Sequence, residues 1–168
     1  YIAHSDLKPP YLCLVASGGH SHIVEVLDYT KFHVVGRTRD DAAGECFDKC
    51  ARAMGFPYPG GVHIDKASVS GNKDAYELPR PKVTGSEFDF SFSGLKTAVI
   101  NLLHNSQQKG IEINKNDLSA GIQYTISDIL CEKTMAAAEM LGYKTIAVAG
   151  GVSANSGVRA AFEKACAE

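Results

Sequence analysis

Apolar runs of strand length alternate along the chain with apolar positions at helical spacing. Residues 11–16 form a continuous apolar run, which is typical of a buried strand. Residues 22–27 and 32–36 follow at short intervals, so the three runs together predict a three-stranded meander. A further strand is predicted over residues 145–149.

Helical spacing of apolar residues predicts much of the remaining structure. The first helix is expected directly after Thr38-Arg39-Asp40-Asp41, which matches the capping-box pattern, and it should end at Gly55. Apolar positions between Leu118 and Met140 predict one long amphipathic helix, and a final helix should begin near Asn155. The order of strands, helices, strand and helix indicates an α/β protein.

The middle of the chain is rich in turn-forming residues. Pro57-Tyr58-Pro59-Gly60-Gly61 predicts a turn, which a short helix over residues 62–70 should follow. Residues 71–87 are polar and interrupted by prolines, which predicts a loop or an insertion. Phe88 to Phe92 alternates with period two and predicts a strand, and a helix is expected over residues 95–103.

The composition indicates one ordinary domain over residues 1–168, since 45% of the residues are hydrophobic. A net charge of -2 and a pI of about 6.3 argue against a dominant basic surface for nucleic acid, but they permit a local basic patch. No apolar stretch approaches the ~20 residues that span a membrane, and no signal peptide opens the chain, so we expect a soluble, cytoplasmic protein. The chain has no initiator Met and stops inside an apparent helix, so we expect a fragment of a longer protein.

Neither the cysteine nor the histidine spacing identifies a complete metal site. The five cysteines are an odd number within apolar segments, which favours reduced thiols over a disulfide framework. Cys46 and Cys50 lie four apart on a predicted helix, and His20 and His22 share one face of a strand. Either pair could share a metal, but no third ligand accompanies it. We therefore interpret the two cysteines as small core residues.

The most distinctive chemical feature is an apolar strand that runs into Gly-Gly at two places, within residues 15–21 and within residues 149–155. Glycine lets the backbone approach a ligand closely, and small hydroxyl or amide side chains beside it can donate hydrogen bonds. Although the two turns are more than a hundred residues apart, they could close on one ligand; the alternative is two ordinary tight turns. Asn155 could bind an adenine edge or a sugar hydroxyl, or it could only cap the final helix.

Two further clusters allow both a functional and a structural interpretation. Asp41, Glu45 and Asp48 would share one side of the first helix, where they could accept hydrogen bonds from ribose hydroxyls or hold a hydrated cation. The alternative is a solvated helix face, because Glu45–Lys49 and Asp48–Arg52 are favourable i,i+4 pairs.

The segment Ser91 to Lys96 offers hydroxyls, an amide and a positive charge at the start of a predicted helix. Such a helix start could bind an anion. The alternative is an ordinary serine-capped helix with a solvated lysine. The S-x-x-K spacing of Ser93 and Lys96 is attributed to chance, because its companion motifs are absent.

Five blocks together resemble the bacterial tRNA threonylcarbamoyladenosine transferases, a family formerly described as O-sialoglycoprotein endopeptidases. They are Val15-Ala16-Ser17-Gly18-Gly19-His20-Ser21, Asp40-Asp41-Ala42-Ala43-Gly44-Glu45-Cys46-Phe47-Asp48-Lys49, Tyr58-Pro59-Gly60-Gly61, Asp89-Phe90-Ser91-Phe92-Ser93-Gly94-Leu95-Lys96-Thr97, and Ala149 to Asn155. The resemblance implies an actin-like ATPase fold of the ribonuclease-H-like type, incomplete in this chain. It also implies transfer of a threonylcarbamoyl group from threonylcarbamoyl-AMP to N6 of adenosine 37, in tRNAs that read codons beginning with A.

The resemblance further implies which residues bind the adenylate. The loop lining it would be Val15, Ala16, Ser17, Gly18 and Gly19. The nucleoside and ribose end would be held by Asp48, Gly61 and Asp65, and the second turn would contribute Asn155. Two positions depart from the family pattern. Val62 stands where the family usually has Pro, and Gly121-Ile122-Gln123 replaces an S-F-Q-like stretch.

The family binds a metal, usually iron, through an H-x-x-x-H pair and an aspartate, and neither block is found in this chain. His4 does not match the pair. We therefore expect no catalytic or metal-ligating residue here and weak or absent turnover by this chain alone. The implied partners are tRNA, a catalytically inactive paralogue and a small ATPase. The alternatives are a nucleotide-binding or scaffold module without chemistry, and a metalloprotease, although no H-E-x-x-H motif or nucleophile–base pair is visible.

Overall fold

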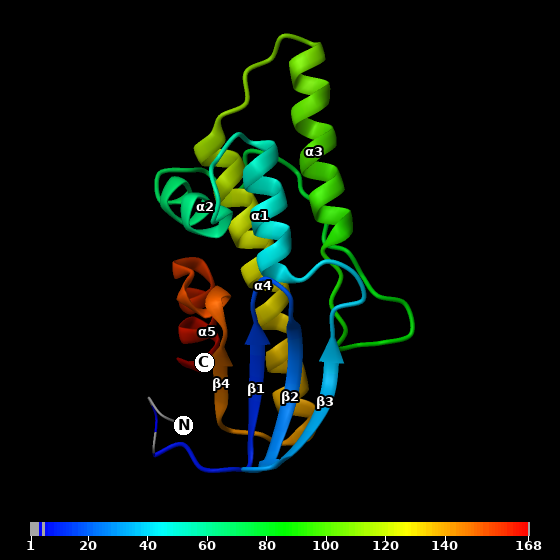
Figure 1. The fold of residues 1–168 in the computed structure, drawn as a ribbon, viewed down its shortest axis with the longest axis vertical. Coiled ribbons are helices and arrows are strands. Elements are labelled where there is room, and N and C mark those ends of the chain that lie inside the picture. The colour runs from blue at the N-terminus through cyan, green and yellow to red at the C-terminus, as the bar shows by residue number, and fades with distance from the viewer. Residues whose placement is uncertain (1–3, 5, 168) are drawn as a thin grey trace.

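A computed structural model describes residue 4 and residues 6–167 of the chain. Its four-stranded sheet consists of β1 (Tyr11–Ala16), β2 (Ser21–Asp28), β3 (Lys31–Arg37) and β4 (Ile146–Ala149), in the order β3-β2-β1-β4 (Figure 1). The pairs β1–β2 and β2–β3 are antiparallel, whereas β4 pairs with β1 in parallel. The predicted meander and the late strand are therefore confirmed.

The helices follow the predicted order, with small shifts at their ends. They are α1 (Ala43–Ala53), α2 (Gly60–Ser68), α3 (Ser93–Gln108), α4 (Lys115–Leu141) and α5 (Ser156–Ala167), with a 3₁₀ turn η1 (Gly151–Ala154) before α5. No helix within residues 6–167 is both long and apolar enough to cross a membrane.

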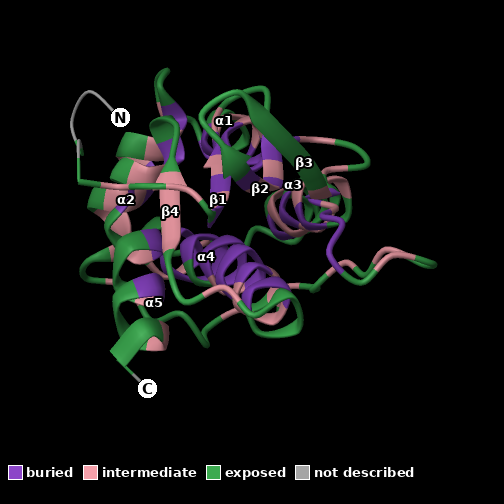
Figure 2. Cartoon of the chain, turned by 90° about the horizontal axis from the view of Figure 1, so that it is seen from below, coloured by how far each residue is buried: buried purple, intermediate pink, exposed green. Residues whose placement is uncertain are grey.

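The core forms where α4 crosses one face of the sheet. Alternate residues of β1, namely Leu12, Leu14 and Ala16, are fully buried, as expected when every second side chain of a strand points to the same face. Helices α4 and α5 lie on that side of the sheet, and α4 is buried along most of its length (Figures 1 and 2). On β3, by contrast, Phe32 and Val34 remain exposed.

Two sequence predictions about the region around α1 are wrong. Helix α1 begins at Ala43, and Thr38 does not cap it, because the Thr38 hydroxyl donates to the carbonyl oxygen of Asp41 at 2.6 Å. The Ala43 amide instead donates to the Ser21 hydroxyl of β2 at 2.9 Å. The predicted strand over residues 88–92 is reduced to a single parallel bridge between Thr38 and Phe90.

The loop over residues 71–87 packs against α4, which explains Gly121 in that helix. A Cβ at Gly121 would lie 3.2 Å from Leu78 Cδ1 and 3.3 Å from the carbonyl oxygen of Lys73. Glycine inside a helix costs roughly 0.5–1 kcal/mol relative to alanine. Here its small size lets the loop approach the helix.

Candidate functional site

The two Gly-Gly turns lie side by side because β1 and β4 are parallel neighbours. Val15 pairs with Ala149 in the last register position, so both strands end at the same edge of the sheet. Gly150 is essential to this arrangement. Its φ of 97° and ψ of 171° fall in a region populated almost exclusively by glycine, and a Cβ there would lie 2.2 Å from the carbonyl oxygen of Ala16.

The first turn, residues 17–20, is stabilised from within. The Ser17 amide donates to the His20 carbonyl oxygen at 2.8 Å, and the Ser17 hydroxyl accepts from the His20 amide at 3.1 Å. The turn also packs against α1, since a Cβ at Gly44 would lie 2.6 Å from the Ser17 carbonyl oxygen. At Gly18 and Gly19, however, a Cβ would have no neighbour within 4 Å. The fold itself therefore does not require glycine at these two positions.

A pocket of about 420 Å³ lies between the two turns, α1 and α2. Its lining includes five of the residues expected at the site: Gly18, Asp48, Gly61, Asp65 and Asn155. Of the remaining predicted residues, Val15 and Ala16 belong to β1, and Ala16 is fully buried. Ser17 bonds within its own turn, and Gly19 has open space around it. The structure thus brings together most of the predicted set around one cavity.

Asp48 joins α1 to the start of α2. Its Oδ1 accepts the Gly60 amide at 2.7 Å, and no ion pair with Arg52 forms among the described residues. Gly60 lets the start of α2 approach α1 this closely, since a Cβ at residue 60 would lie 2.4 Å from the Ala51 Cβ. The i,i+4 interpretation of Asp48 is therefore wrong. Asp48 lines the pocket, and its second carboxylate oxygen accepts no hydrogen bond within the described chain.

Asp65 is held by the helix that follows the second turn. Its carboxylate accepts the Ser156 amide at 3.2 Å, the Ser156 hydroxyl, and Gln123 Nε2 at 3.1 Å. Gln123 is in turn held by Ser68, whose hydroxyl donates to Gln123 Oε1 at 2.6 Å. This network fixes the carboxylate at the pocket wall. In the sequence, Gln123 stands out only as part of a departure from the family pattern, and no local pattern indicates that it contacts Asp65.

For Asn155, the structure shows one of the two roles that the sequence left open. Its Oδ1 accepts the Val158 amide at 3.1 Å, so it caps α5. Its Nδ2 is buried without a hydrogen-bond partner, in a residue that is only 8% exposed and lines the pocket. Native proteins rarely leave a buried donor unpaired.

Two of the acidic residues before and within α1, Asp41 and Glu45, belong to one connected ion-pair cluster. Asp41 pairs with Lys49 at 2.9 Å and with Lys96 at 2.8 Å, and Glu45 pairs with Lys49 at 2.7 Å. Burial alone would raise the pKa of Asp41, but hydrogen bonds from Lys96 and Lys49 hold that pKa below its usual value. The solvated-face interpretation therefore describes Glu45 and Lys49 but not Asp48.

The anion predicted at the start of α3 is the side chain of Asp40. It accepts the hydroxyls of Ser91 and Ser93 and the amides of Phe92 and Ser93. These hydrogen bonds outweigh the effect of burial and lower the pKa of Asp40. Lys96, which was expected to add a charge for a ligand, pairs instead with Asp41. The helix start is thus occupied by the protein itself.

The described residues do not fit the metal that the resemblance implies. No three His, Cys, Asp or Glu side chains within residues 6–167 gather into a metal-binding group. The rings of His20 and His22 are 5.4 Å apart, and the Cys46 and Cys50 sulfurs are 4.0 Å apart in the core. The hydrogen bond with Cys50 and burial raise the pKa of Cys46, so this thiol stays protonated. We therefore assign no step to a metal held by this chain.

The fold places the chain in the class of actin-like ATPase folds. It is similar to component A of (R)-2-hydroxyglutaryl-CoA dehydratase from Acidaminococcus fermentans, with a TM-score of 0.53 and 18% identity over 94% of this chain and 52% of that one. It is also similar to the activator of 2-hydroxyisocaproyl-CoA dehydratase from Clostridium difficile, solved with bound ADPNP, with a TM-score of 0.55 and 14% identity over 96% and 53% of the two chains.

Within this class, the chain belongs to the tRNA N6-adenosine threonylcarbamoyltransferase (TsaD) family, whose model matches residues 1–168. The chain is 50% identical to the tRNA N6-adenosine threonylcarbamoyltransferase of Clostridium botulinum strain Hall over 166 residues, which are 99% of this chain and 49% of that protein. It is 49% identical to the Clostridioides difficile strain 630 protein of the same description over 160 residues, 95% of this chain and 47% of that one. The chain thus spans about half the length of the curated relatives it matches. The older endopeptidase alternative finds no support in these matches.

Proposed function

We propose that this chain binds the adenylate end of threonylcarbamoyl-AMP in a transferase that modifies N6 of adenosine 37 in tRNA. One observation carries the proposal: Asn155 lines the pocket between the two turns, and its Nδ2 is buried without a hydrogen-bond partner. Leaving a buried donor unsatisfied costs about 1–3 kcal/mol. A ligand acceptor in the pocket would remove this cost. Family membership supports a nucleotide as that ligand.

The other pocket residues suit different parts of an adenylate. Carboxylates accept hydrogen bonds, so Asp48 and Asp65 suit the ribose hydroxyls. Around Gly18 and Gly151 a Cβ would meet nothing within 4 Å, so the backbone of both turns is accessible to a phosphate. In the transfer, the N6 amine of adenosine attacks the carbamoyl carbon and loses a proton. The new C–N bond forms as the bond from carbon to the phosphate oxygen breaks, and AMP leaves with the electron pair. The contribution of this chain is to bind and orient the adenylate.

The same proposal includes the protein's partners and location. A tRNA-modifying family implies a tRNA substrate. The resemblance adds a catalytically inactive paralogue and a small ATPase as protein partners, and iron or another divalent metal supplied by other parts of the protein. These partners and the cytoplasm, where tRNA is modified, belong to the proposal.

Calorimetric titration with AMP tests the pocket. Asn155→Ser keeps an oxygen that can cap α5 but removes the carboxamide NH₂, so we expect AMP affinity to fall at least about tenfold with little change in thermal stability. Asn114→Ser is the matched control, because Asn114 caps α4 by accepting the amides of Asn116 and Asp117 and does not line the pocket. Equal AMP affinity in the Asn155→Ser variant and the native chain would contradict the proposal.

A tRNA modification assay tests the chemistry separately. The chain is supplied with threonylcarbamoyl-AMP and unmodified tRNA, and the Clostridium botulinum relative serves as the positive control. We expect little or no turnover, because the described residues contain no metal-binding group. Full activity by this chain would contradict that expectation. AMP binding without transfer would support a nucleotide-binding role for this part of the protein.

A further inference from the structure

Cationic and aromatic side chains line the nucleotide pocket and the cavity beside it, or contact Phe56, and Glu45 and Asp48 line that second cavity as well. We define the pocket mouth as Arg52, Phe56, Tyr58, His63, Lys66 and Lys115. A second cavity of about 570 Å³ shares Gly18, Asp48 and Tyr58 with the nucleotide pocket and extends to Arg52 and Phe56. The two cavities are therefore adjacent, and Tyr58 lies where they meet.

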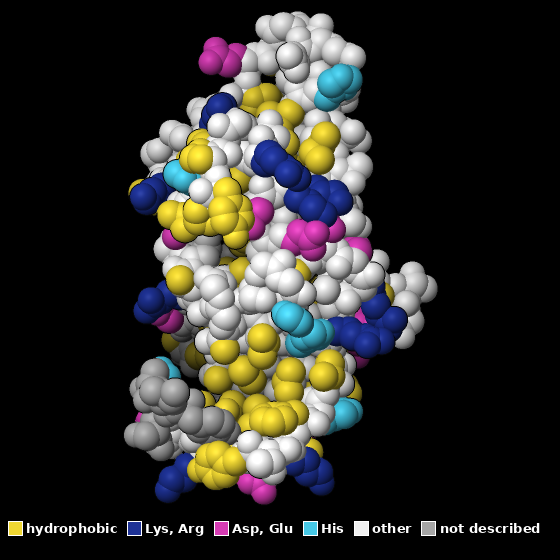
Figure 3. Space-filling model, in the orientation of Figure 1, with side chains coloured by type: hydrophobic (Ala, Val, Ile, Leu, Met, Phe, Trp, Pro, Cys, Tyr) yellow, Lys and Arg dark blue, Asp and Glu magenta, His cyan; other side chains and the backbone are white. Residues whose placement is uncertain are grey.

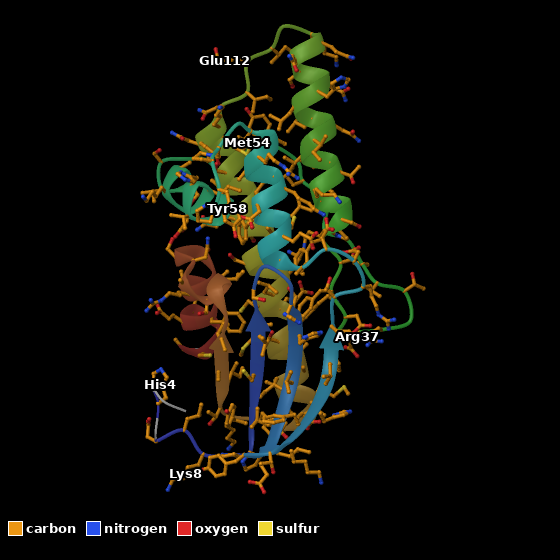
Figure 4. The ribbon with its side chains drawn as sticks, viewed as in Figure 1. His4, Lys8, Arg37, Met54, Tyr58 and Glu112 are labelled. Carbon is orange, nitrogen blue, oxygen red and sulfur yellow. The ribbon has the colours of Figure 1, made fainter. Side chains whose placement is uncertain are left out.

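Tyr58 is the most exposed large hydrophobic side chain of the described residues, at 84%. It lies between α1 and α2 (Figure 4). No hydrogen bond or ring contact with another described residue holds the phenol. An exposed aromatic ring beside a nucleotide pocket is a surface on which an unpaired base can stack.

The cations of the pocket mouth are available for a ligand. Arg52, Lys66 and Lys115 are exposed and make no ion pair with any described residue. Lys49, Lys73 and Lys96, in contrast, each pair with a carboxylate. Other exposed cations without an ion pair, such as Lys31, Lys109 and Arg159, lie elsewhere on the chain. What distinguishes Arg52, Lys66 and Lys115 is their place beside the two cavities and their aromatic residues.

One of these cations contacts an aromatic ring, and the other two line a cavity together with Tyr58. Lys115 Nζ lies 5.5 Å from the centre of the Phe56 ring, and the His63 ring stacks on Phe56 at 6.1 Å. Lys66 lines the nucleotide pocket together with Tyr58. On the molecular surface, Lys, Arg and His side chains lie beside hydrophobic ones on the face over α1 and α2, with Asp and Glu side chains among them (Figure 3).

We propose that the pocket mouth binds single-stranded RNA. Tyr58 stacks on the base that is delivered to the adenylate, and Arg52, Lys66 and Lys115 contact the flanking phosphates. This assignment rests on the proposed function, since it gives the nucleotide pocket an acceptor. Single-stranded RNA fits better than a duplex, because an exocyclic amine must leave the base stack to react. It also fits better than a protein surface, because stacking platforms ringed by unpaired cations are typical of single-strand binding.

The test measures fluorescence anisotropy of a labelled RNA hairpin that carries an unmodified adenosine in its loop, with a fully paired RNA duplex as the comparison. Tyr58→Ala should weaken hairpin binding about 5- to 150-fold, while Tyr58→Phe should retain it. Tyr29→Ala is the matched control, because Tyr29 is also exposed but follows β2 at the end of the strand, away from the residues of the pocket mouth. Equal binding of hairpin and duplex, with no effect of Tyr58→Ala, would overturn the proposal.

The salt dependence tests the proposed binding of phosphates. For single strands, the slope of log affinity against log salt decreases by about 0.7 for each phosphate that the protein no longer neutralises. The combined substitution of Arg52, Lys66 and Lys115 by Ala should therefore lower the slope by about 2, and Arg159→Ala on α5 should leave it unchanged. An unchanged slope in the triple variant would also overturn the proposal.

Parallel AMP titrations separate this proposal from the proposed function. Arg52→Ala and Lys115→Ala should weaken RNA binding but not AMP binding, because neither residue lines the nucleotide pocket. If the native chain binds AMP but not the hairpin, the RNA assignment is wrong and the proposed nucleotide site stands. If the native chain does not bind AMP, the proposed function itself fails.

Discussion

Gly150 provides the sharpest test of how the site is built, because its neighbour Gly151 is a built-in control. At Gly150, φ is 97° and ψ is 171°, and a Cβ would lie 2.2 Å from the Ala16 carbonyl oxygen. Holding alanine in that backbone region costs about 1–3 kcal/mol, and the overlap with β1 adds to the cost. At Gly151 a Cβ would meet nothing within 4 Å, and no positive φ is required there. We therefore expect Gly150→Ala to destabilise the fold by at least about 1–3 kcal/mol and Gly151→Ala to leave its stability nearly unchanged.

Urea denaturation followed by circular dichroism measures this difference. The midpoint of Gly150→Ala should fall while the slope of the transition stays constant, which indicates lost stability rather than a changed denatured state. For a domain of this size, each kcal/mol corresponds to about 2–4 °C in melting temperature. Gly151 lines the pocket, so Gly151→Ala should weaken AMP binding without changing the stability of the fold. Identical midpoints for the two variants would refute the proposed requirement for glycine at residue 150.

Two further predictions concern the carboxylates of Asp65 and Asp89. Gln123→Glu would remove the Nε2 donor to Asp65 and place a second carboxylate beside it, so the variant should lose stability relative to the native chain. Urea midpoints check this, and an unchanged midpoint would contradict it. Asp89 is 5% exposed and accepts the Arg37 amide at 2.8 Å and the Arg39 guanidinium, and these bonds outweigh burial and lower its pKa. Because the pKa of Asp89 is lowered in the folded state, its carboxylate stabilises the fold at pH values above the ordinary pKa of Asp, and this stability is lost as the pH falls through the folded-state pKa. Asp89→Asn should therefore cost about 1–3 kcal/mol at pH 7. It should also make the stability depend less on pH in the acidic range. If the stability of the Asp89→Asn variant falls with decreasing pH as steeply as that of the native chain, Asp89 does not contribute to the acid dependence of stability.

Local patterns were sufficient to predict most of the regular structure. The apolar run at residues 11–16 and the helical spacing from Leu118 to Met140 reflect burial against one continuous core, so the elements β1 and α4 could be located from sequence. The predicted strand over residues 88–92 failed for a non-local reason. Within the described residues, its backbone forms one isolated bridge, between Phe90 and Thr38, and no strand, while its Phe side chains are buried in the core. Alternation of hydrophobic residues predicts burial but does not supply a neighbouring strand.

The site could be predicted in its parts but not in its internal contacts. Helical spacing assigned Asp48 a partner on its own helix, whereas its hydrogen bond goes to Gly60 at the start of the next helix. Likewise, the start of α3 was expected to hold an external anion, and that anion is Asp40, which lies more than fifty residues earlier. Such contacts join segments distant in sequence. No periodicity within one element can therefore reveal them.

The pocket can form during folding only after β4 has paired with β1, because it lies between the turns that follow these two strands. The pairing joins Leu12 to Ile146, so it closes a loop of most of the chain, and contacts of such separation form slowly. The antiparallel meander can form without β4, whose four residues are partly or fully exposed. Detachment of β4 would therefore remove the pocket while the other strands stay paired. A nucleotide bound in the pocket would oppose that detachment, because the pocket exists only when β1 and β4 are paired.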